Sequence, residues 1–98
     1  MAQFDVFRTG HGDIVIDCQA DQWSAYNTRF VGLLLPEDPK VPRVERLNPL
    51  LDIDGEPYVM MTEFAAALPT RQLSRKILSF AEYDVRIKSA LDMLIHGH

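Results

Sequence analysis

One stretch of the chain has a clear helical pattern, and it lies at the C-terminal end. Apolar side chains recur there at helical spacing: Tyr83, Ile87, Ala90, Leu91, Leu94 and Ile95. This spacing predicts an amphipathic helix that turns these residues toward a core. Ser79 and Glu82 form a capping-box pattern, so we expect the helix to begin at Ser79. Gly97 is a natural stop for it.

The residues before this helix have the short patterns of strands. Five segments either alternate in hydropathy or are rich in β-branched residues, and we expect strands at 3–7, 14–18, 29–35, 50–53 and 58–62. Gly32, inside the third segment, indicates a bulge or a close backbone contact. Residues 63–68 have helical propensity but are too few to form a stable helix alone.

The connections between the segments have recognisable turn chemistry. Residues 10–13, Gly-His-Gly-Asp, predict a tight loop. Pro36, Pro39 and Pro42 predict an extended connection without a helix. Asp54-Gly55 between two apolar segments is a strong hairpin signal. The order of about five strands followed by one helix favours a small, strongly bent sheet or barrel that the helix closes. With 98 residues, we expect one domain over residues 1–98.

Composition excludes several classes of protein. The longest apolar run, residues 31–35, is far shorter than the ~20 residues of a membrane span, and the N-terminus has no secretory signal pattern. Cys18 is the single cysteine, which suits a reducing cytoplasm. The net charge of −4, with the excess acid in residues 1–38, argues against non-specific nucleic-acid binding. We therefore expect a soluble cytoplasmic protein without a membrane or nucleic-acid partner of its own.

No catalytic or cofactor motif stands out. The chain has no phosphate-binding loop, dinucleotide fingerprint or His-Glu-x-x-His motif, so we expect no cofactor. His96 and His98 lack a third ligand nearby in sequence, so we expect no metal site. Cys18 lies in a strand pattern and is interpreted as a small buried hydrophobe. Arg71, Arg75 and Lys76 are interpreted as a solvated surface. Residue chemistry favours a binding protein over an enzyme.

The order and spacing of many small motifs resemble the CcdB family over nearly the whole chain. The motifs are Gln3-Phe4-x-Val6, Asp17-x-Gln19-x-Asp21, Arg46-Leu47-Asn48-Pro49, Asp54-Gly55, Met60-Met61-Thr62, Ala66, Leu68-Pro69 and Asp84-x-Arg86-Ile87-Lys88-x-Ala90-Leu91-Asp92-x-x-x-x-Gly97. The resemblance implies an SH3-like barrel with a C-terminal helix, as in the CcdB, Kid and MazF toxins, and a homodimer. It also implies that residues 63–68 continue a strand, which we prefer to the helical turn that propensity suggests.

This resemblance implies a toxin that acts by binding and not by catalysis. CcdB-type toxins bind the A subunit of DNA gyrase and trap gyrase in its cleaved complex with DNA, and a CcdA-like antitoxin masks the toxin. The gyrase contacts implied here are Asp92 and the last three residues, His96, Gly97 and His98. The first loop faces an acidic antitoxin segment in the family, which implies antitoxin contacts at Arg8 and His11.

The tail departs from the family pattern, which is typically Trp-Gly-Ile. Only Gly97 is retained. An indole that stacks on a guanidinium contributes ~0.5–2 kcal/mol, and a buried Ile contributes ~1.5–3 kcal/mol. Their loss weakens gyrase binding unless the host gyrase differs to match. One alternative is therefore an attenuated module that binds its antitoxin and regulates its operon without poisoning gyrase. A ribonuclease of the MazF/Kid type is a further alternative, which rests on the shared fold alone.

Overall fold

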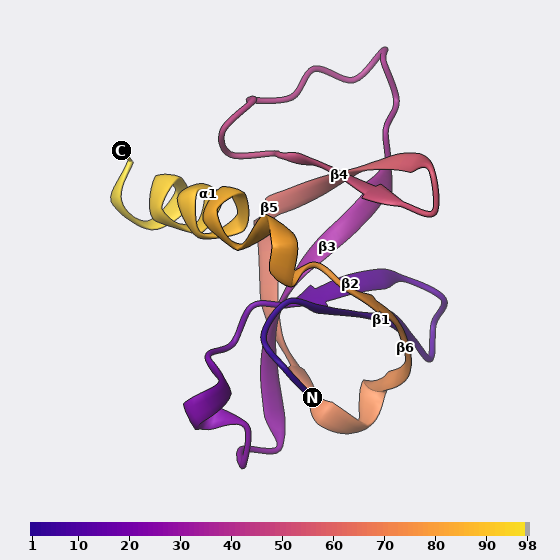
Figure 1. Ribbon diagram of the computed structural model, residues 1–98, viewed down its shortest axis with the longest axis vertical. Helices are drawn as coiled ribbons and strands as arrows, with labels where there is room; N and C mark the ends of the chain where they lie inside the picture. Colours follow the sequence, from indigo (N-terminus) through magenta and orange to yellow (C-terminus); the bar gives the residue numbers. More distant parts are fainter. Residues whose placement is uncertain (98) are drawn as a thin grey trace.

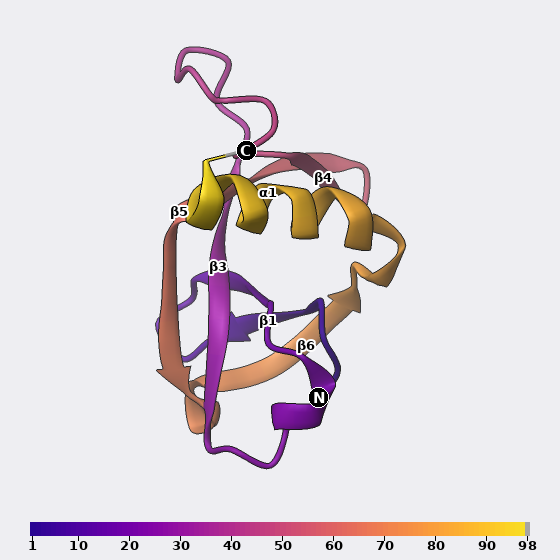
Figure 2. The same cartoon turned by 90° about the vertical axis from the view of Figure 1, so that its left-hand side faces the viewer.

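The computed structural model describes residues 1–97. Six strands form one antiparallel sheet in the order β4-β5-β3-β2-β1-β6, and a helix follows at the C-terminal end (Figure 1). Seen from the side, the sheet curls into a half-barrel and the helix crosses above it (Figure 2). The elements are β1 Asp5–Thr9, β2 Ile14–Asp17, β3 Thr28–Pro36, β4 Leu50–Ile53, β5 Glu56–Pro69, β6 Leu73–Ser79 and α1 Asp84–His96. The predicted SH3-like barrel with a C-terminal helix is confirmed.

The main core lies between the helix and the facing side of the sheet. Because side chains alternate along a strand, Val6 and Ile16 point to this side while their neighbours Phe7 and Val15 point to the other. Ile87 of α1 is completely buried in the main core. The opposite face of the sheet carries a second, smaller cluster of Phe7, Val15, Val31 and Leu73. Residues of β1 and β2 are therefore buried on both faces.

Gly32 lies at an irregularity in the pairing of β3 with β5. The register between β3 and β5 shifts between Val31 and Leu33, so Gly32 sits at a bulge. A Cβ atom built on Gly32 would lie 2.9 Å from Met60 Cε and 3.4 Å from Ile16 Cγ2. The bulge is confirmed, whereas the close contacts at this glycine are with the side chains of Met60 and Ile16 and not with another backbone.

The predicted hairpin joins β4 and β5 through a two-residue turn. Ile53 pairs with Glu56, and the two residues between them both have positive φ, 53° at Asp54 and 88° at Gly55. This is the geometry that Asp-Gly favours in tight hairpins. β5 then continues for 14 residues, to Pro69. Residues 63–68 are thus strand, as the family resemblance implied, because Ala66 and Ala67 pair with β3 and tertiary pairing outweighs local propensity.

The proline-rich connection leaves the sheet as a long loop without a helix, as predicted (Figure 2). Its second half is fastened to β5 by Asn48, which is buried. The Asn48 side-chain nitrogen donates hydrogen bonds to the Met60 carbonyl (3.2 Å) and to Glu63 Oε1 (2.7 Å). Asn48 Oδ1 accepts a hydrogen bond from the Val44 amide at 3.1 Å. Asn48, from the Arg46-Leu47-Asn48-Pro49 motif of the family resemblance, therefore holds this loop against β5.

Two predictions about the last third of the chain are wrong. The sequence indicated about five strands, whereas β6 is a sixth that pairs with β1. The helix was expected to begin at Ser79, but Ser79 ends β6 and its hydroxyl accepts a hydrogen bond from the Ala81 amide at 3.2 Å. A short 3₁₀ turn, Ala81–Tyr83, intervenes before α1 begins at Asp84. Phe80, between β6 and this turn, is 1% exposed and packs in the main core. Its packing holds the chain against the core before α1 begins.

Candidate interaction site

The C-terminal end of α1 stands clear of the sheet. The helix runs outward from β5, so its last turn lies beyond the strands (Figure 1). Gly97 ends it in the left-handed conformation (φ 77°), and its amide donates to the Met93 carbonyl at 2.9 Å. Glycine adopts this conformation without strain, which explains why the helix stops there. His96 is the last helical residue and is exposed, while His98 lies outside the described residues.

The apolar face of the helix continues past the surface that it covers. Ile87 and Ala90 are fully buried, but Leu94 is 40% exposed and Ile95 is 67% exposed. The prediction that Leu94 and Ile95 face the core is therefore wrong, because no strand reaches the last turn (Figure 1). Leu94 and Ile95 therefore leave adjacent apolar surface exposed at the end of the helix.

Asp92, Ile95 and His96 share one face of this exposed turn. They stand at positions i, i+3 and i+4, which brings their side chains to the same side of a helix, and all three are exposed. The structure thus brings together the predicted contacts Asp92, His96 and Gly97. It adds Ile95, which the sequence placed in the core. The signal that could have identified Ile95 is its position near the end of the helix, beyond the part of the helix that packs against the sheet.

The first loop is held together by its own residues. Arg8 Nη1 donates to the Gly12 carbonyl at 3.0 Å. Thr9 Oγ1 accepts hydrogen bonds from the His11 amide (3.3 Å) and the Asp13 amide (3.2 Å). The His11 side chain in this loop is exposed, while Arg8 is half-buried. Arg8 and His11 belong to the same loop but line different hollows: His11 lies with Val15 and Phe64, and Arg8 lies with Ile14 and Tyr58.

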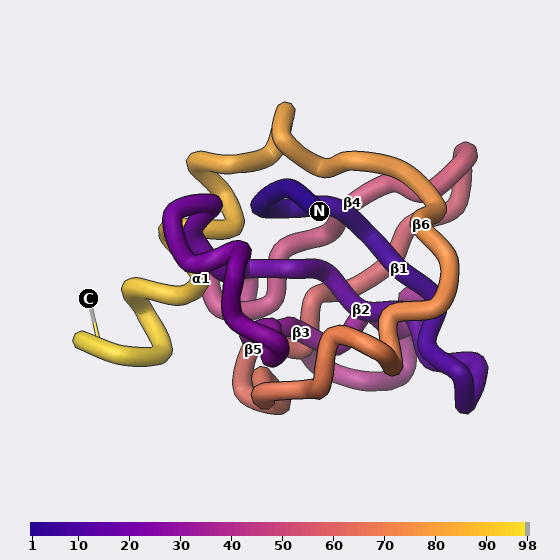
Figure 3. The backbone as a smooth tube through the Cα atoms, turned by 90° about the horizontal axis from the view of Figure 1, so that it is seen from below, coloured from indigo at the N-terminus to yellow at the C-terminus, as the bar shows by residue number. Residues whose placement is uncertain are grey.

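The two predicted contact surfaces lie at opposite sides of the molecule. The loop between β1 and β2 and the end of α1 are on opposite sides in Figures 1 and 3. The structure does not bring Arg8 and His11 together with Asp92, His96 and Gly97. A partner at the first loop can therefore contact the protein without covering the helix end.

The basic residues around β6 do not form one surface. Arg75 pairs across the ladder with Arg8, and Lys76, the next residue, reaches the Asp5 carboxylate at 3.4 Å. Successive side chains of a strand point to opposite faces, so Arg75 and Lys76 diverge. Arg71 lies in the 3₁₀ turn before β6. These positions agree with their interpretation as solvated surface residues.

The environment of Cys18 and the placing of the potential metal ligands bear on the chemistry that the described residues can perform. Cys18 is buried, and burial together with the nearby Asp17 charge raises the pKa of its thiol to about 12. A thiol in this state is a poor nucleophile. Within residues 1–97, no three His, Cys, Asp or Glu side chains are grouped so that they could hold a metal ion. No helix in that range is long and apolar enough to span a bilayer.

A curled six-stranded sheet closed by a helix with an exposed last turn defines a small SH3-like barrel whose candidate site suits binding. The family model described as "CcdB protein" matches residues 3–97. The chain therefore belongs to the CcdB family, the toxins of toxin–antitoxin pairs, which act without catalysis. No curated protein matches the chain.

Proposed function

We propose that this protein is a toxin that binds the DNA gyrase A subunit and traps the cleaved gyrase–DNA complex in the cytoplasm. Family membership supports the toxin class. The observation that carries the proposal is the exposed last turn of α1, where Asp92, Ile95 and His96 share one face directly before Gly97. A projecting helix end of this kind can enter a recess in a partner while the barrel stays outside.

The chemistry of this end differs from the apolar tail typical of the family. Imidazole rings at His96 and His98 replace an indole and an isoleucine side chain. The exposed Ile95 side chain offers apolar surface one residue before His96 and partly replaces what the tail lacks. We therefore expect the protein to act best on the gyrase of its own host.

A homodimer is part of this proposal. The face of the sheet turned away from α1 carries Leu35, 42% exposed, and Phe64, 60% exposed, around the second core cluster. Apolar surface of this kind is stabilised when a second copy covers it. Sedimentation velocity tests it: Phe64→Asp is expected to shift the protein toward monomer, whereas Val44→Asp, on the exposed loop, is expected to leave the dimer intact.

A CcdA-like antitoxin is the second proposed partner, with Arg8 and His11 in its contact surface. Because this loop lies far from the helix end, antitoxin binding is expected to survive removal of residues 96–98 (Figure 3). Arg8→Ala is expected to weaken the antitoxin complex while gyrase inhibition by the free toxin persists. Calorimetric titration with the cognate antitoxin measures the first effect, and a supercoiling assay measures the second.

The decisive experiment is a gyrase cleavage assay with the enzyme of the source organism and with a standard bacterial gyrase. Linear DNA that accumulates with the host enzyme, and its loss on deletion of residues 96–98, are the expected results. The deletion variant must keep the circular dichroism spectrum and the dimer of the full chain. Unchanged inhibition by that variant would refute the proposal.

The substituted tail favours one second candidate, a module that binds its antitoxin and represses its operon without poisoning gyrase. Absence of inhibition with either gyrase, together with retained antitoxin binding, would favour this candidate over gyrase poisoning. The same purified protein incubated with RNA tests the ribonuclease alternative, for which we expect intact RNA.

A further inference from the structure

A hollow in the surface lies between the two outer strands of the curled sheet. β4 and β6 are the two ends of the strand order, and Ile53 of β4 and Ile77 of β6 both line this hollow. Its volume is about 270 Å³. The other lining residues belong to β1, β2, β5, β6 and the turn between β4 and β5: Arg8, Ile14, Asp54, Glu56, Tyr58 and Arg75. Residues far apart in the sequence therefore meet where the sheet stays open.

Two arginines stand side by side in the hollow. Arg8 of β1 is the cross-strand partner of Arg75 of β6. Like charges directly opposite each other destabilise a pair of strands. Arg8 Nη1 donates a hydrogen bond to the Gly12 carbonyl at 3.0 Å, which uses one of the five N–H donors of its guanidinium group. An anion bound between the two arginines would offset their repulsion.

Two carboxylates reach the same hollow from the turn that joins β4 to β5. Asp54 is in the turn, and Glu56 follows it as the cross-strand partner of Ile53. Both acidic side chains are exposed. Within residues 1–97, neither these carboxylates nor the two arginines of the hollow take part in an ion pair. The hollow therefore has two positive and two negative groups that do not neutralise one another by direct contact.

The deeper residues of the hollow are largely apolar. Ile53 is 7% exposed and belongs to the main core, and Ile14, Tyr58 and Ile77 pack against that core. An apolar group that covers them would be removed from water, which stabilises a complex. The volume of about 270 Å³ is slightly below the ~300–1,000 Å³ of pockets for drug-sized ligands, so the hollow suits a smaller molecule.

We propose that this hollow binds a small zwitterion with an apolar side chain, an amino acid or a dipeptide. The ligand's carboxylate pairs with the two arginines, its ammonium group pairs with the two acidic residues, and its side chain covers the isoleucines. Arginine binds carboxylates through paired hydrogen bonds, which orients the ligand. The acidic residues would repel a simple anion, and the arginines would repel a simple cation. A molecule with both charges suits all four groups.

This inference goes beyond the proposed toxin function, because it concerns a small molecule and not a protein partner. Arg8 belongs both to the hollow and to the proposed antitoxin surface. The test therefore uses Arg75 and Glu56, which lie outside that surface. Neither gyrase nor antitoxin takes part in it, so its outcome is independent of the proposed toxin function.

Nuclear magnetic resonance tests the proposal on the full chain. Isotope-labelled protein is titrated with L-leucine and with the dipeptide leucyl-leucine, each up to its solubility limit. We expect saturable shifts of the amide signals of Ile53, Tyr58 and Arg75, and smaller shifts in α1. The ligand with the higher affinity shows whether a free amino acid or a dipeptide is preferred. Absence of saturable shifts with both ligands would overturn the proposal.

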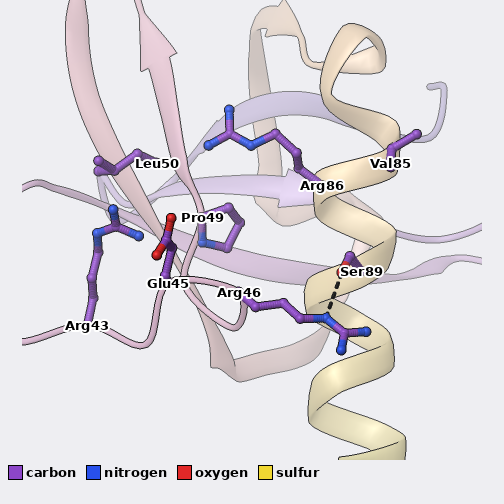
Figure 4. Close-up of a pocket in the computed structure, with 8 residues that line it drawn as sticks. All are labelled: Arg43, Glu45, Arg46, Pro49, Leu50, Val85, Arg86 and Ser89. Atoms are coloured by element: carbon purple, nitrogen blue, oxygen red, sulfur yellow. Dashed lines mark hydrogen bonds between the residues drawn. The ribbon is translucent and has the colours of Figure 1, made fainter. Parts of the chain in front are cut away.

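Two substitutions each remove one charge from the hollow. Arg75→Gln and Glu56→Gln are each expected to lower the affinity for the tighter ligand at least tenfold. The matched controls are Arg86→Gln and Glu45→Gln, which remove the same charges from a separate hollow beside α1 (Figure 4). Each control is expected to change the affinity less than twofold. Equal losses in the site and control variants would reduce the effect to net charge and overturn the proposal.

Blocked ligands test whether both charges of the zwitterion are used. The N-acetyl derivative of the tighter ligand lacks the ammonium group, and its C-terminal amide lacks the carboxylate. Each is expected to bind the wild type at least tenfold more weakly than the unblocked ligand. Undiminished affinity for either blocked form would show that one pair of charged residues makes no contact, and would overturn the proposal.

Discussion

Asp17 and Arg29 form an ion pair enclosed by the protein, with 0% and 1% of their side chains exposed. Asp17 Oδ2 accepts hydrogen bonds from Arg29 Nε, at 2.9 Å, and from Nη2. Asp17 Oδ1 accepts a further hydrogen bond from the Gln19 amide at 3.0 Å. The pair joins the end of β2 to the start of β3. It therefore fixes the connection between two strands inside the sheet.

Removing one member of this pair is expected to be far more harmful than removing both. Asp17→Ala leaves the Arg29 charge buried and uncompensated, so we expect a loss of ~3–5 kcal/mol in unfolding free energy. Asp17→Leu/Arg29→Met is expected to recover most of that loss. Urea denaturation measures both. The control is Asp84→Ala, which breaks a pair with Lys88 whose side chains are 45% and 57% exposed, and whose loss is expected to cost less than ~1 kcal/mol. Equal effects of Asp17→Ala and Asp84→Ala would contradict the prediction.

Gly32→Ala is expected to destabilise the protein by ~1–3 kcal/mol, because its Cβ would press on Met60 Cε and on Ile16. The cost depends on how far the end of the Met60 side chain can move. A leucine at position 60 has no atom in the place of Cε, so Gly32→Ala is expected to cost less in a Met60→Leu background. A double-mutant cycle by urea denaturation measures this coupling. Strictly additive effects would show that the contact with Met60 is not the cause.

Stability is expected to fall at alkaline pH because of Cys18. The thiol titrates near 9.0 when unfolded, and burial raises its pKa to about 12 in the folded protein. Above pH 9 the unfolded state therefore releases a proton that the native state keeps, which favours unfolding by up to ~1.4 kcal/mol per pH unit until pH 12. Urea denaturation between pH 8 and 10.5 should give a steeper decline for the wild type than for Cys18→Ala. Parallel declines would contradict this assignment.

Two isoleucines of the same helix are expected to have different roles, Ile95 in binding and Ile87 in stability. Ile95→Ser is expected to change the unfolding free energy by less than ~0.5 kcal/mol, because the side chain is 67% exposed, and to reduce growth arrest on expression. Ile87→Ser, at a residue with no exposed surface, is expected to cost ~2–5 kcal/mol. Circular dichroism and growth curves separate the two effects. Full toxicity of Ile95→Ser would exclude this side chain from the contact surface.

Asn48→Ala is expected to loosen the loop before β4. The substitution removes both hydrogen bonds that the side chain donates and the one it accepts from Val44, with an expected cost of ~1–3 kcal/mol. Amide hydrogen exchange at Val44 should accelerate more than exchange in β2. An unchanged exchange rate at Val44 would show that the loop is held by other contacts.

Periodicity predicted the strands whose alternation is regular and missed the one whose register shifts. In β6, the ladder with β1 is irregular at two places, between Val6 and Phe7 and between Arg8 and Thr9. Ile77 and Leu78 are adjacent apolar residues that both pack against the main core. A period of two is therefore not visible in residues 73–79. Likewise, the capping-box pattern at Ser79 did not reveal that Phe80 is buried and delays the helix.

The site residues could be predicted where their structure depends only on residues close to them in sequence. Gly97 was correctly placed as the end of the helix, because a helix stop depends on neighbouring residues. The contact between Arg46 and Ser89 could not be predicted, since the two residues are 43 apart in sequence and meet only through the packing of α1. The exposure of Ile95 depends on where the sheet ends. The spacing of apolar residues along a helix carries no information about the position of that edge.

The pairing of β1 with β6 has a consequence for how the chain is made. Ser74 Oγ donates to the Arg8 carbonyl across 66 residues of sequence, so β1 lacks one neighbour until β6 has been synthesised. Contacts this distant slow folding, because a long loop must close before they form. The nascent chain is then expected to remain incompletely folded while most of it has already left the ribosome. The helix that follows β6 is positioned only after the sheet has closed, so the proposed gyrase contact at its end is expected to form only after β1 and β6 have paired.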